Sequence, residues 1–284
     1  MKVLDDATLR LRAAGIESPR LEARLLLSHA TGLSQLDVIG GGVFVDEAAR
    51  AKFDALIARR TANEPLAYIL GRREFWSLEF QVGPGVLIPR PESETLIETA
   101  LKLVPERDQK LRVLDLGTGS GCLLLAFLSE RPNASGVGVD ISEDALAWAQ
   151  RNAENLKLNG RAKFIKDDWG RSLGSAFDLI FANPPYVRSG DIATLAPDVA
   201  GHEPASSLDG GADGLNAYRA IASMVLPRLA LNGRLLLEIG QGQAEAVTKL
   251  FESQGFIAEG TVNDLARIHR CVVMVAEAQH SRQR

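Results

Sequence analysis

Short apolar runs alternate with longer amphipathic segments from Leu111 almost to the end of the chain. The runs predict strands at 111–116, 135–139, 162–166, 177–182, 233–239, 256–262 and 270–277. The intervening segments predict helices at 120–131, 142–158, 214–231 and 243–254. Because strands separated by helices pair in parallel, we expect an α/β fold with a mostly parallel sheet covered by helices on both faces. No helix separates the last two strands, which favours an antiparallel hairpin at the sheet edge.

The first 65 residues follow a helical period instead. Leu21, Leu25 and Leu26 are typical of its apolar positions, and the pattern predicts four or five short helices. Residues 66–90 then become strand-like from Tyr68 and Ile69 onwards. We therefore expect a helical domain at 1–65, a β-hairpin linker at 66–90 and the α/β domain at 91–284, which begins with a helix from Pro91 to about Val104.

Residues 187–213 are rich in Gly, Asp, Ala and Pro and show no regular period. They follow the strand predicted at 177–182. We expect a long loop there, in the position of a substrate lid.

The overall composition argues against several classes of protein. Hydrophobic residues make up 46% and charged residues 24% of 284 residues, as in ordinary globular chains. The net charge of −4 disfavours a protein that grips long nucleic acid, since such proteins neutralise phosphates with clustered Lys and Arg. The N-terminus has no apolar leader, and no segment approaches 18 uninterrupted apolar residues. We expect a soluble, cytoplasmic protein that does not bind membranes.

Cysteine and histidine are too sparse for a metal site. Cys122 and Cys271 have no partner at metal-ligand spacing, and the four histidines are scattered. We interpret both cysteines as buried structural thiols.

A glycine loop follows the strand predicted at 111–116. It reads Asp115-Leu116-Gly117-Thr118-Gly119-Ser120-Gly121, and glycines at a helix N-terminus let the backbone approach a ligand closely. Asp140 ends the next strand, 19 residues after Gly121, where its carboxylate can accept both ribose hydroxyls. Alternatively, the loop is a structural turn and Asp140 caps the helix beginning at Ser142. A dinucleotide enzyme would show the same pair, yet DLGTGSG with Asp140 resembles the cofactor loop of class I S-adenosylmethionine methyltransferases.

Asp167, Asp168 and Trp169 follow the strand predicted at 162–166. An indole offers a stacking face, and a carboxylate can accept from an exocyclic amine. In the methyltransferase fold this position holds the adenine ring. Trp169 as ordinary core is the alternative.

Asn183, Pro184, Pro185 and Tyr186 come at the carboxyl end of the strand 177–182. An amide, a stiffened backbone with free carbonyls and an aromatic face together suit a planar, neutral nitrogen group. The tetrapeptide alone does not choose the acceptor, because N6-adenine, guanine-N2 and glutamine-N5 methyltransferases use similar sequences. A structural turn is the remaining alternative.

The wider set of motifs resembles the HemK/PrmC family, the release factor glutamine N5-methyltransferases. The resemblance covers nearly all of the chain, including the helical front domain and hairpin, and it rests on IPRPESE at 88–94, DLGTGSG, NPPY, Glu203-Pro204, Asp209 to Leu215 and Glu238-Ile239-Gly240. Two positions depart from the usual pattern: Ser93 replaces a threonine and keeps the hydroxyl, and Gly201-His202 precedes Glu203.

The resemblance implies a Rossmann-like class I fold with a seven-stranded sheet and methylation of the glutamine side-chain amide (N5) in the Gly-Gly-Gln motif of class-1 peptide chain release factors. The methyl donor would be S-adenosyl-L-methionine, leaving S-adenosyl-L-homocysteine. The front domain would bind the release factor, and we expect a monomer without direct nucleic-acid binding. The alternatives are a ribosomal-protein glutamine and a nucleic-acid amine.

The implied site residues follow position by position. The cofactor would contact Gly117, Thr118, Gly119, Ser120, Gly121, Asp140, Asp168, Trp169 and Asn183. Asn183, Pro184, Pro185 and Tyr186 would hold the glutamine and serve the catalytic step. For Arg90, Glu92 and Glu94, a solvated helix start and a docking role are equally good interpretations.

Overall fold

The computed structural model describes residues 2–40, 45–174 and 176–277, and the chain separates into two compact units. One unit comprises Met1–Arg72 with Leu195–His202, and the other comprises Arg73–Thr194 with Glu203–Arg284. The segment 195–202 thus packs with the N-terminal helices although it lies far from them in the sequence.

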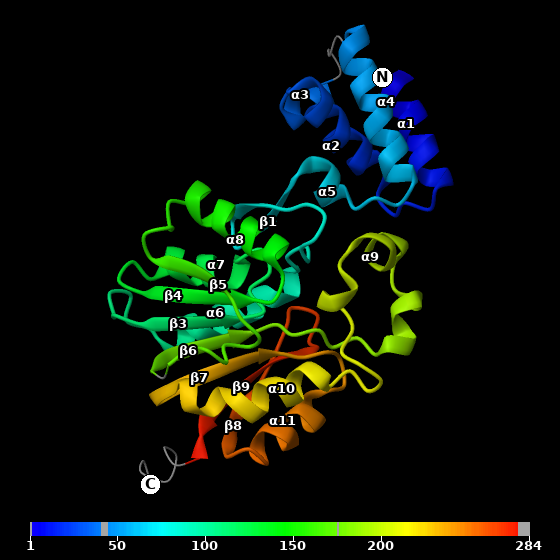
Figure 1. The fold of residues 1–284 in the computed structure, drawn as a ribbon. Coiled ribbons are helices and arrows are strands. Elements are labelled where there is room, and N and C mark those ends of the chain that lie inside the picture. The colour runs from blue at the N-terminus through cyan, green and yellow to red at the C-terminus, as the bar shows by residue number, and fades with distance from the viewer. Residues whose placement is uncertain (1, 41–44, 175, 278–284) are drawn as a thin grey trace. The chain divides into compact units, whose positions relative to one another are not determined.

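A seven-stranded sheet forms the centre of the larger unit. Its order is β5-β4-β3-β6-β7-β9-β8 (Figure 1). The β3, β4, β5, β6 and β7 strands pair in parallel, while β9 pairs antiparallel with both β7 and β8. This confirms the predicted α/β fold and its antiparallel hairpin. The bounds are β3 Arg112–Leu116, β4 Ser135–Asp140, β5 Ala162–Lys166, β6 Phe177–Ala182, β7 Leu229–Glu238, β8 Phe256–Asn263 and β9 His269–Ala276.

Strand residues alternate between two apolar clusters on the two faces of this sheet. Val113 and Phe181 pack with α6 (Glu94–Leu103), α7 (Cys122–Glu130) and α8 (Glu143–Asn155). Leu114 and Ile180 pack on the opposite side with α10 (Asn216–Val225) and α11 (Ala244–Glu252). Because both faces are covered, the central strands read as continuous apolar runs rather than as an alternation of apolar and polar residues.

The register of the central strands brings three chain segments to one edge. Leu116 lies opposite Ala182 on β6 and opposite Val139 on β4. The residues that follow these positions, Gly117, Asn183 and Asp140, therefore lie at the same carboxyl edge of the sheet.

A two-stranded hairpin, β1 (Arg72–Phe75) and β2 (Leu78–Gln81), precedes this sheet. Its turn residues Trp76 and Ser77 have φ of 52° and 56°, as the tight turns that match the twist of hairpin strands require. Asn152 on α8 anchors the hairpin: its Oδ1 accepts from the Gln81 N–H at 2.7 Å, and its Nδ2 donates to the Gln81 carbonyl at 3.0 Å. The same Nδ2 donates to the Ser120 carbonyl at 2.9 Å, so one buried amide connects the hairpin to the glycine loop.

The smaller unit is built from helices around an apolar cluster that includes Leu26, Phe53 and Ile57. Its helices are α1 Lys2–Ala13, α2 Pro19–Thr31, α3 Gln35–Gly40, α4 Glu47–Thr61, α5 Leu66–Leu70 and α9 Pro197–His202. The buried Arg60 guanidinium on α4 pairs with Glu22 at 2.6 Å and lies 3.6 Å from the Asp198 carboxylate on α9. This charge cluster fixes α9 to the N-terminal helices.

Four sequence-based expectations about local structure differ from what the structure shows. Residues 66–70 form the helix α5 rather than a strand, because Pro65 precedes them and Gly71 ends the helix in a left-handed conformation. The segment 187–213 is not a plain loop, since it contains η2 (Ser189–Thr194), α9 and η3 (Ala205–Ser207). The helix expected at 214–231 ends at Val225, where a 3-10 turn (η4, Leu226–Arg228) with Pro227 leads into β7. At residues 91–93 the helix α6 is preceded by a 3-10 turn, η1 (Pro91–Ser93).

None of the helices in the described residues is both long and apolar enough to cross a membrane.

Replacing Asn152 by Ala is expected to lower the free energy of unfolding of the larger unit by about 1–3 kcal/mol, because it leaves the hydrogen-bonding groups of Gln81 and Ser120 unpaired. Urea unfolding followed by tryptophan fluorescence measures this unit, since Trp76, Trp148 and Trp169 all belong to it. The exposed Asn155, on the same helix, is the control: Asn155→Ala should change stability by about 0.5 kcal/mol or less. Equal stability of both variants would contradict the anchoring role of Asn152.

Candidate active site

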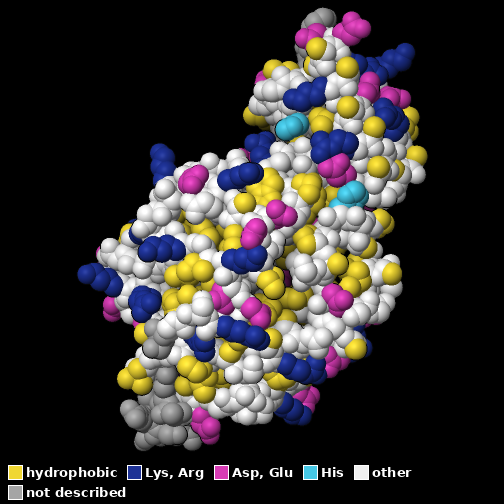
Figure 2. Space-filling view, in the orientation of Figure 1, with side chains coloured by type: hydrophobic (Ala, Val, Ile, Leu, Met, Phe, Trp, Pro, Cys, Tyr) yellow, Lys and Arg dark blue, Asp and Glu magenta, His cyan; other side chains and the backbone are white. Residues whose placement is uncertain are grey.

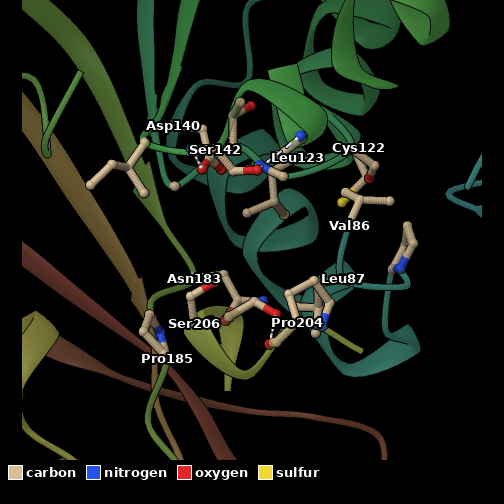
Figure 3. Close-up of a pocket in the computed structure, with 18 of the residues that line it drawn as sticks. Val86, Leu87, Cys122, Leu123, Asp140, Ser142, Asn183, Pro185, Pro204 and Ser206 are labelled. Carbon is tan, nitrogen blue, oxygen red and sulfur yellow. Dashed lines mark hydrogen bonds between the residues drawn. The ribbon is translucent and has the colours of Figure 1, made fainter. Parts of the chain in front are cut away.

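A pocket opens at the carboxyl ends of β3, β4 and β6 (Figure 3). The glycine loop, the end of β4, residues 167–169 after β5 and the segment after β6 line it. Residues from the stretches 85–93 and 204–207 complete its wall. Figure 3 shows Asp140 and Ser142 on one side of the pocket and Asn183 and Pro185 on the other.

The glycine loop turns sharply between β3 and α7. The Gly119 N–H donates to Asp140 Oδ2 at 2.9 Å, and the Thr118 N–H donates to the Val139 carbonyl at 2.8 Å. A Cβ built on Gly119 would meet nothing closer than Val86 Cγ2 at 4.0 Å, so this residue faces open space. Gly121 has a positive φ of 80°, as Gly119 has one of 55°, but its surroundings differ, since a Cβ there would lie 3.2 Å from Leu125 Cδ1. Gly117, Thr118, Gly119 and Ser120 line the pocket, whereas Gly121 serves the packing of α7.

Asp140 links the loop to the start of α8. Its Oδ2 accepts from Gly119, and its Oδ1 accepts from the Ser142 N–H at 2.9 Å. Burial raises the pKa of this carboxyl, and the backbone N–H donors oppose that effect. Ser142, not Asp140, is the N-cap residue of α8, because its Oγ accepts from the Ala145 N–H at 3.2 Å. Asp140 lines the pocket, and each of its oxygens keeps a second lone pair for a ligand.

The residues after β5 differ from one another in what they do. Asp167 accepts from the Arg171 and Ser172 N–H groups at 2.6 and 3.0 Å and thereby shapes the turn. Asp168 is half exposed and lies 3.2 Å from the Arg171 guanidinium. The Trp169 ring lies against Gly117, where a Cβ would be 3.2 Å from it. Both Asp168 and Trp169 line the pocket.

The Asn-Pro-Pro-Tyr tetrapeptide is divided between the pocket and the interior. Asn183 and Pro185 line the pocket, while Pro184 is buried. Tyr186 does not line the pocket. Its ring packs with the apolar cluster under α10 and α11, and its carbonyl accepts from Gln243 Nε2 at 3.0 Å. Burial raises the pKa of the Tyr186 hydroxyl, which stays protonated and donates to Glu238 Oε1 at 3.4 Å.

Two further groups at the pocket were not anticipated from the sequence as site residues. Glu203 accepts from Arg90 at 2.5 Å and from the Ile88 N–H at 3.0 Å. These bonds hold the wall segment 204–207 next to the wall segment 85–93. Ser93 donates to the buried Glu238 carboxylate at 2.5 Å and accepts from Asn183 Nδ2 at 3.1 Å. Glu238 ends the apolar strand β7, and this position was a usable sequence signal. A carboxylate buried at such a place needs hydrogen-bond partners, because unpaired carboxylates are rarely buried.

Of the charged residues near the start of α6, two have structural partners. Arg90 pairs with Glu203, and Glu94 accepts from the Trp76 N–H at 2.8 Å. Glu92 is exposed. In the described part of the chain, no group of three His, Cys, Asp or Glu side chains is placed to hold a metal ion.

Comparisons with known proteins find a matching family for each of the two units. Residues 2–71 match the PrmC N-terminal domain family, and residues 107–263 match a methyltransferase domain family. A methyltransferase from Pyrococcus furiosus shares the fold, with a TM-score of 0.52 and 16% identity over 78% of this chain and 96% of that one.

Two curated relatives match along most of their length. The release factor glutamine methyltransferase of Rhodospirillum rubrum is 46% identical over 274 residues, which cover 96% of this chain and 83% of that protein. The enzyme of the same name from Caulobacter vibrioides is 44% identical over 268 residues, which cover 94% and 92%. The chain therefore belongs to the family of release factor glutamine methyltransferases.

Proposed function

We propose that this protein transfers a methyl group from S-adenosyl-L-methionine to the side-chain amide nitrogen of the glutamine in the Gly-Gly-Gln motif of class-1 peptide chain release factors. The main support is that Asn183 and the glycine loop line one pocket, so an acceptor amide and a methyl donor could meet there. Family membership, with 46% identity to the release factor glutamine methyltransferase of Rhodospirillum rubrum, supports the choice of acceptor.

The pocket suits the proposed cofactor. Gly119 offers open space beside its backbone, and the Ser120 hydroxyl is buried at the pocket with no hydrogen-bond partner among the described residues. We assign the ribose hydroxyls to Asp140 and the adenine ring to Asp168 and Trp169. When bound, the cofactor supplies an electrophilic methyl group on a sulfonium ion.

The acceptor explains the amide at position 183. An amide nitrogen is a poor nucleophile because its lone pair is delocalised, so the enzyme must orient it in line with the methyl group. The Asn183 carboxamide oxygen and the Pro184 carbonyl would accept its two N–H groups, which favours the pyramidal nitrogen of the transition state. Such orientation can contribute about 7–11 kcal/mol.

A strong base is unnecessary at this site. The methylated amide nitrogen is a strong acid and loses its proton readily. Tyr186, whose pKa is raised by burial, is held as a neutral phenol behind the pocket wall and offers no base. The groups at the pocket therefore act by positioning.

The proposed partner is a protein rather than a nucleic acid. Figure 2 shows Lys and Arg side chains interspersed with Asp and Glu on the visible face, and the net charge is −4. A nucleic-acid enzyme would instead need clustered positive charge. We further propose that the helical unit binds the release factor and that the enzyme acts as a cytoplasmic monomer.

The proposed acceptor can be tested by incubating the purified protein with a class-1 release factor and methyl-labelled cofactor. We expect label on the glutamine of the Gly-Gly-Gln peptide, located by mass mapping, and none on a release factor with Gly-Gly-Ala. Ribosomal proteins and oligonucleotides serve as competing acceptors in the same assay. Label on those acceptors alone, or none at all, would overturn the proposal.

An Asn183→Ala variant should bind the cofactor with a Kd close to that of the parent enzyme but lose about 100- to 1000-fold in kcat, because it lacks the oxygen that accepts from the acceptor amide. Calorimetric titration of the cofactor and single-turnover labelling measure the two quantities separately. A variant with parental turnover would show that Asn183 does not contact the reacting amide.

An Asp140→Ala variant should show the opposite pattern. Loss of a charged acceptor for the ribose would raise the cofactor Kd by about 10- to 150-fold, equivalent to about 1.5–3 kcal/mol. Turnover at saturating cofactor should fall much less than in Asn183→Ala. An unchanged Kd would exclude Asp140 from the cofactor site.

A further inference from the structure

One buried carboxylate connects to both polar side chains of the tetrapeptide. Glu238 ends β7 and is 1% exposed. Its Oε2 accepts from the Ser93 hydroxyl at 2.5 Å, and its Oε1 accepts from the Tyr186 hydroxyl at 3.4 Å. The Ser93 oxygen in turn accepts from Asn183 Nδ2 at 3.1 Å. Glu238 therefore contacts Tyr186 directly and Asn183 through one hydroxyl.

The direction of these hydrogen bonds follows from the chemistry of the groups. An ionised carboxylate only accepts, so Ser93 must donate its single proton to Glu238. The Ser93 oxygen then has only lone pairs to offer to Asn183, and it can bind the NH₂ side of the carboxamide but not the oxygen. This fixes which way the Asn183 amide is turned. Its Oδ1, with no partner among the described residues, is left to accept from a ligand.

We propose that Ser93 and Glu238 are positioning residues for methyl transfer: Glu238 sets the direction of the Ser93 hydroxyl, and Ser93 holds the Asn183 carboxamide with its oxygen available to the acceptor amide. This inference rests on the proposed role of Asn183 in methylating a glutamine. Neither residue needs to touch the cofactor's reacting methyl group or the acceptor nitrogen. Their effect is to exclude the flipped amide, which would present its N–H groups to those of the acceptor.

The protonation of Glu238 controls this arrangement. Burial raises the pKa of its carboxyl to about 7, which the Ser93 hydroxyl and the Arg270 charge oppose. A protonated Glu238 can donate to Ser93, which could then donate to Asn183 Oδ1 and favour the flipped amide. The groups facing Glu238 from the surrounding elements are Glu92 on η1, Cys122 on α7, Tyr186 after β6, Tyr218 on α10, and Arg270 and Cys271 on β9.

Removing the Ser93 hydroxyl tests whether Ser93 holds the Asn183 carboxamide. Ser93→Ala should lower kcat by up to about 100-fold while the cofactor Kd stays within about twofold, and Ser93→Thr, which keeps the hydroxyl, should restore most of the rate. The control is Thr99→Val on α6, which removes another buried hydroxyl, one that donates to the Thr95 carbonyl at 2.7 Å. A parental kcat in folded Ser93→Ala would overturn the proposal.

The pH profile of kcat tests whether Glu238 sets the direction of the Ser93 hydroxyl. Only the ionised Glu238 carboxylate makes Ser93 donate to Glu238 and accept from Asn183 Nδ2, which leaves Asn183 Oδ1 for the acceptor amide. The kcat of the parent enzyme should therefore fall as the pH is lowered through about 7. Glu238→Gln cannot titrate, and its kcat should be lower and free of that inflection. If Glu238→Gln keeps both the parental kcat and the parental profile, Glu238 has no positioning role.

A third measurement needs no methyl acceptor. In protein labelled with ¹⁵N-asparagine, the Asn183 side-chain NH₂ signal is identified by its loss in Asn183→Asp. Exchange of its protons with water should accelerate at least about tenfold in Ser93→Ala and remain unchanged in Thr99→Val. Unchanged exchange in Ser93→Ala would overturn the inference. Because this readout is independent of turnover, a parent enzyme that fails to label Gly-Gly-Gln would refute the proposed function without deciding the Asn183 contact.

Discussion

The parallel register of β3 and β6 is the constraint on which the pocket depends. Leu116 lies opposite Ala182, so the chain leaves the two central strands at neighbouring points as Gly117 and Asn183. A shift of β3 by one residue would turn its side chains Leu114 and Leu116 toward the wrong apolar cluster, at a cost of buried apolar contacts. The packing that stabilises the fold is therefore also what places a glycine loop beside an amide, and no separate device is needed to bring them together.

Polar contacts between residues far apart in the sequence position the remaining segments of the pocket. Ser93 and Glu238 are 145 residues apart, and Arg90 and Glu203 are 113 apart. Both pairs involve a carboxylate that is almost fully buried, and such groups are stable only with partners. Together they connect the stretch 88–93 to β7 and to the segment after α9. The linker preceding α6 is thus part of the pocket's construction and not merely a connection between units.

Much of this arrangement could be predicted from local sequence patterns. The glycine loop, Asp140 and Asn183 each follow a buried strand, and parallel strands bring such positions to one edge. The helix α5 was missed because its five residues are apolar throughout, and a cap at Gly71 decides between helix and strand. Likewise the short helices of 189–207 have no period to detect. The Ser93–Glu238 contact could not be derived, since pairing between distant polar residues depends on the finished fold.

The smaller unit is discontinuous in sequence, and this limits how the protein can be divided. Its helix α9 comes from the middle of the chain and approaches the buried Arg60 through Asp198. A fragment that starts at residue 73 would retain α9 but remove the guanidinium that it faces, while the excised N-terminal helices would lose a carboxylate near Arg60. Modular exchange of the helical unit between relatives would therefore have to transfer two stretches of sequence at once, and the second one is easily overlooked in a linear alignment.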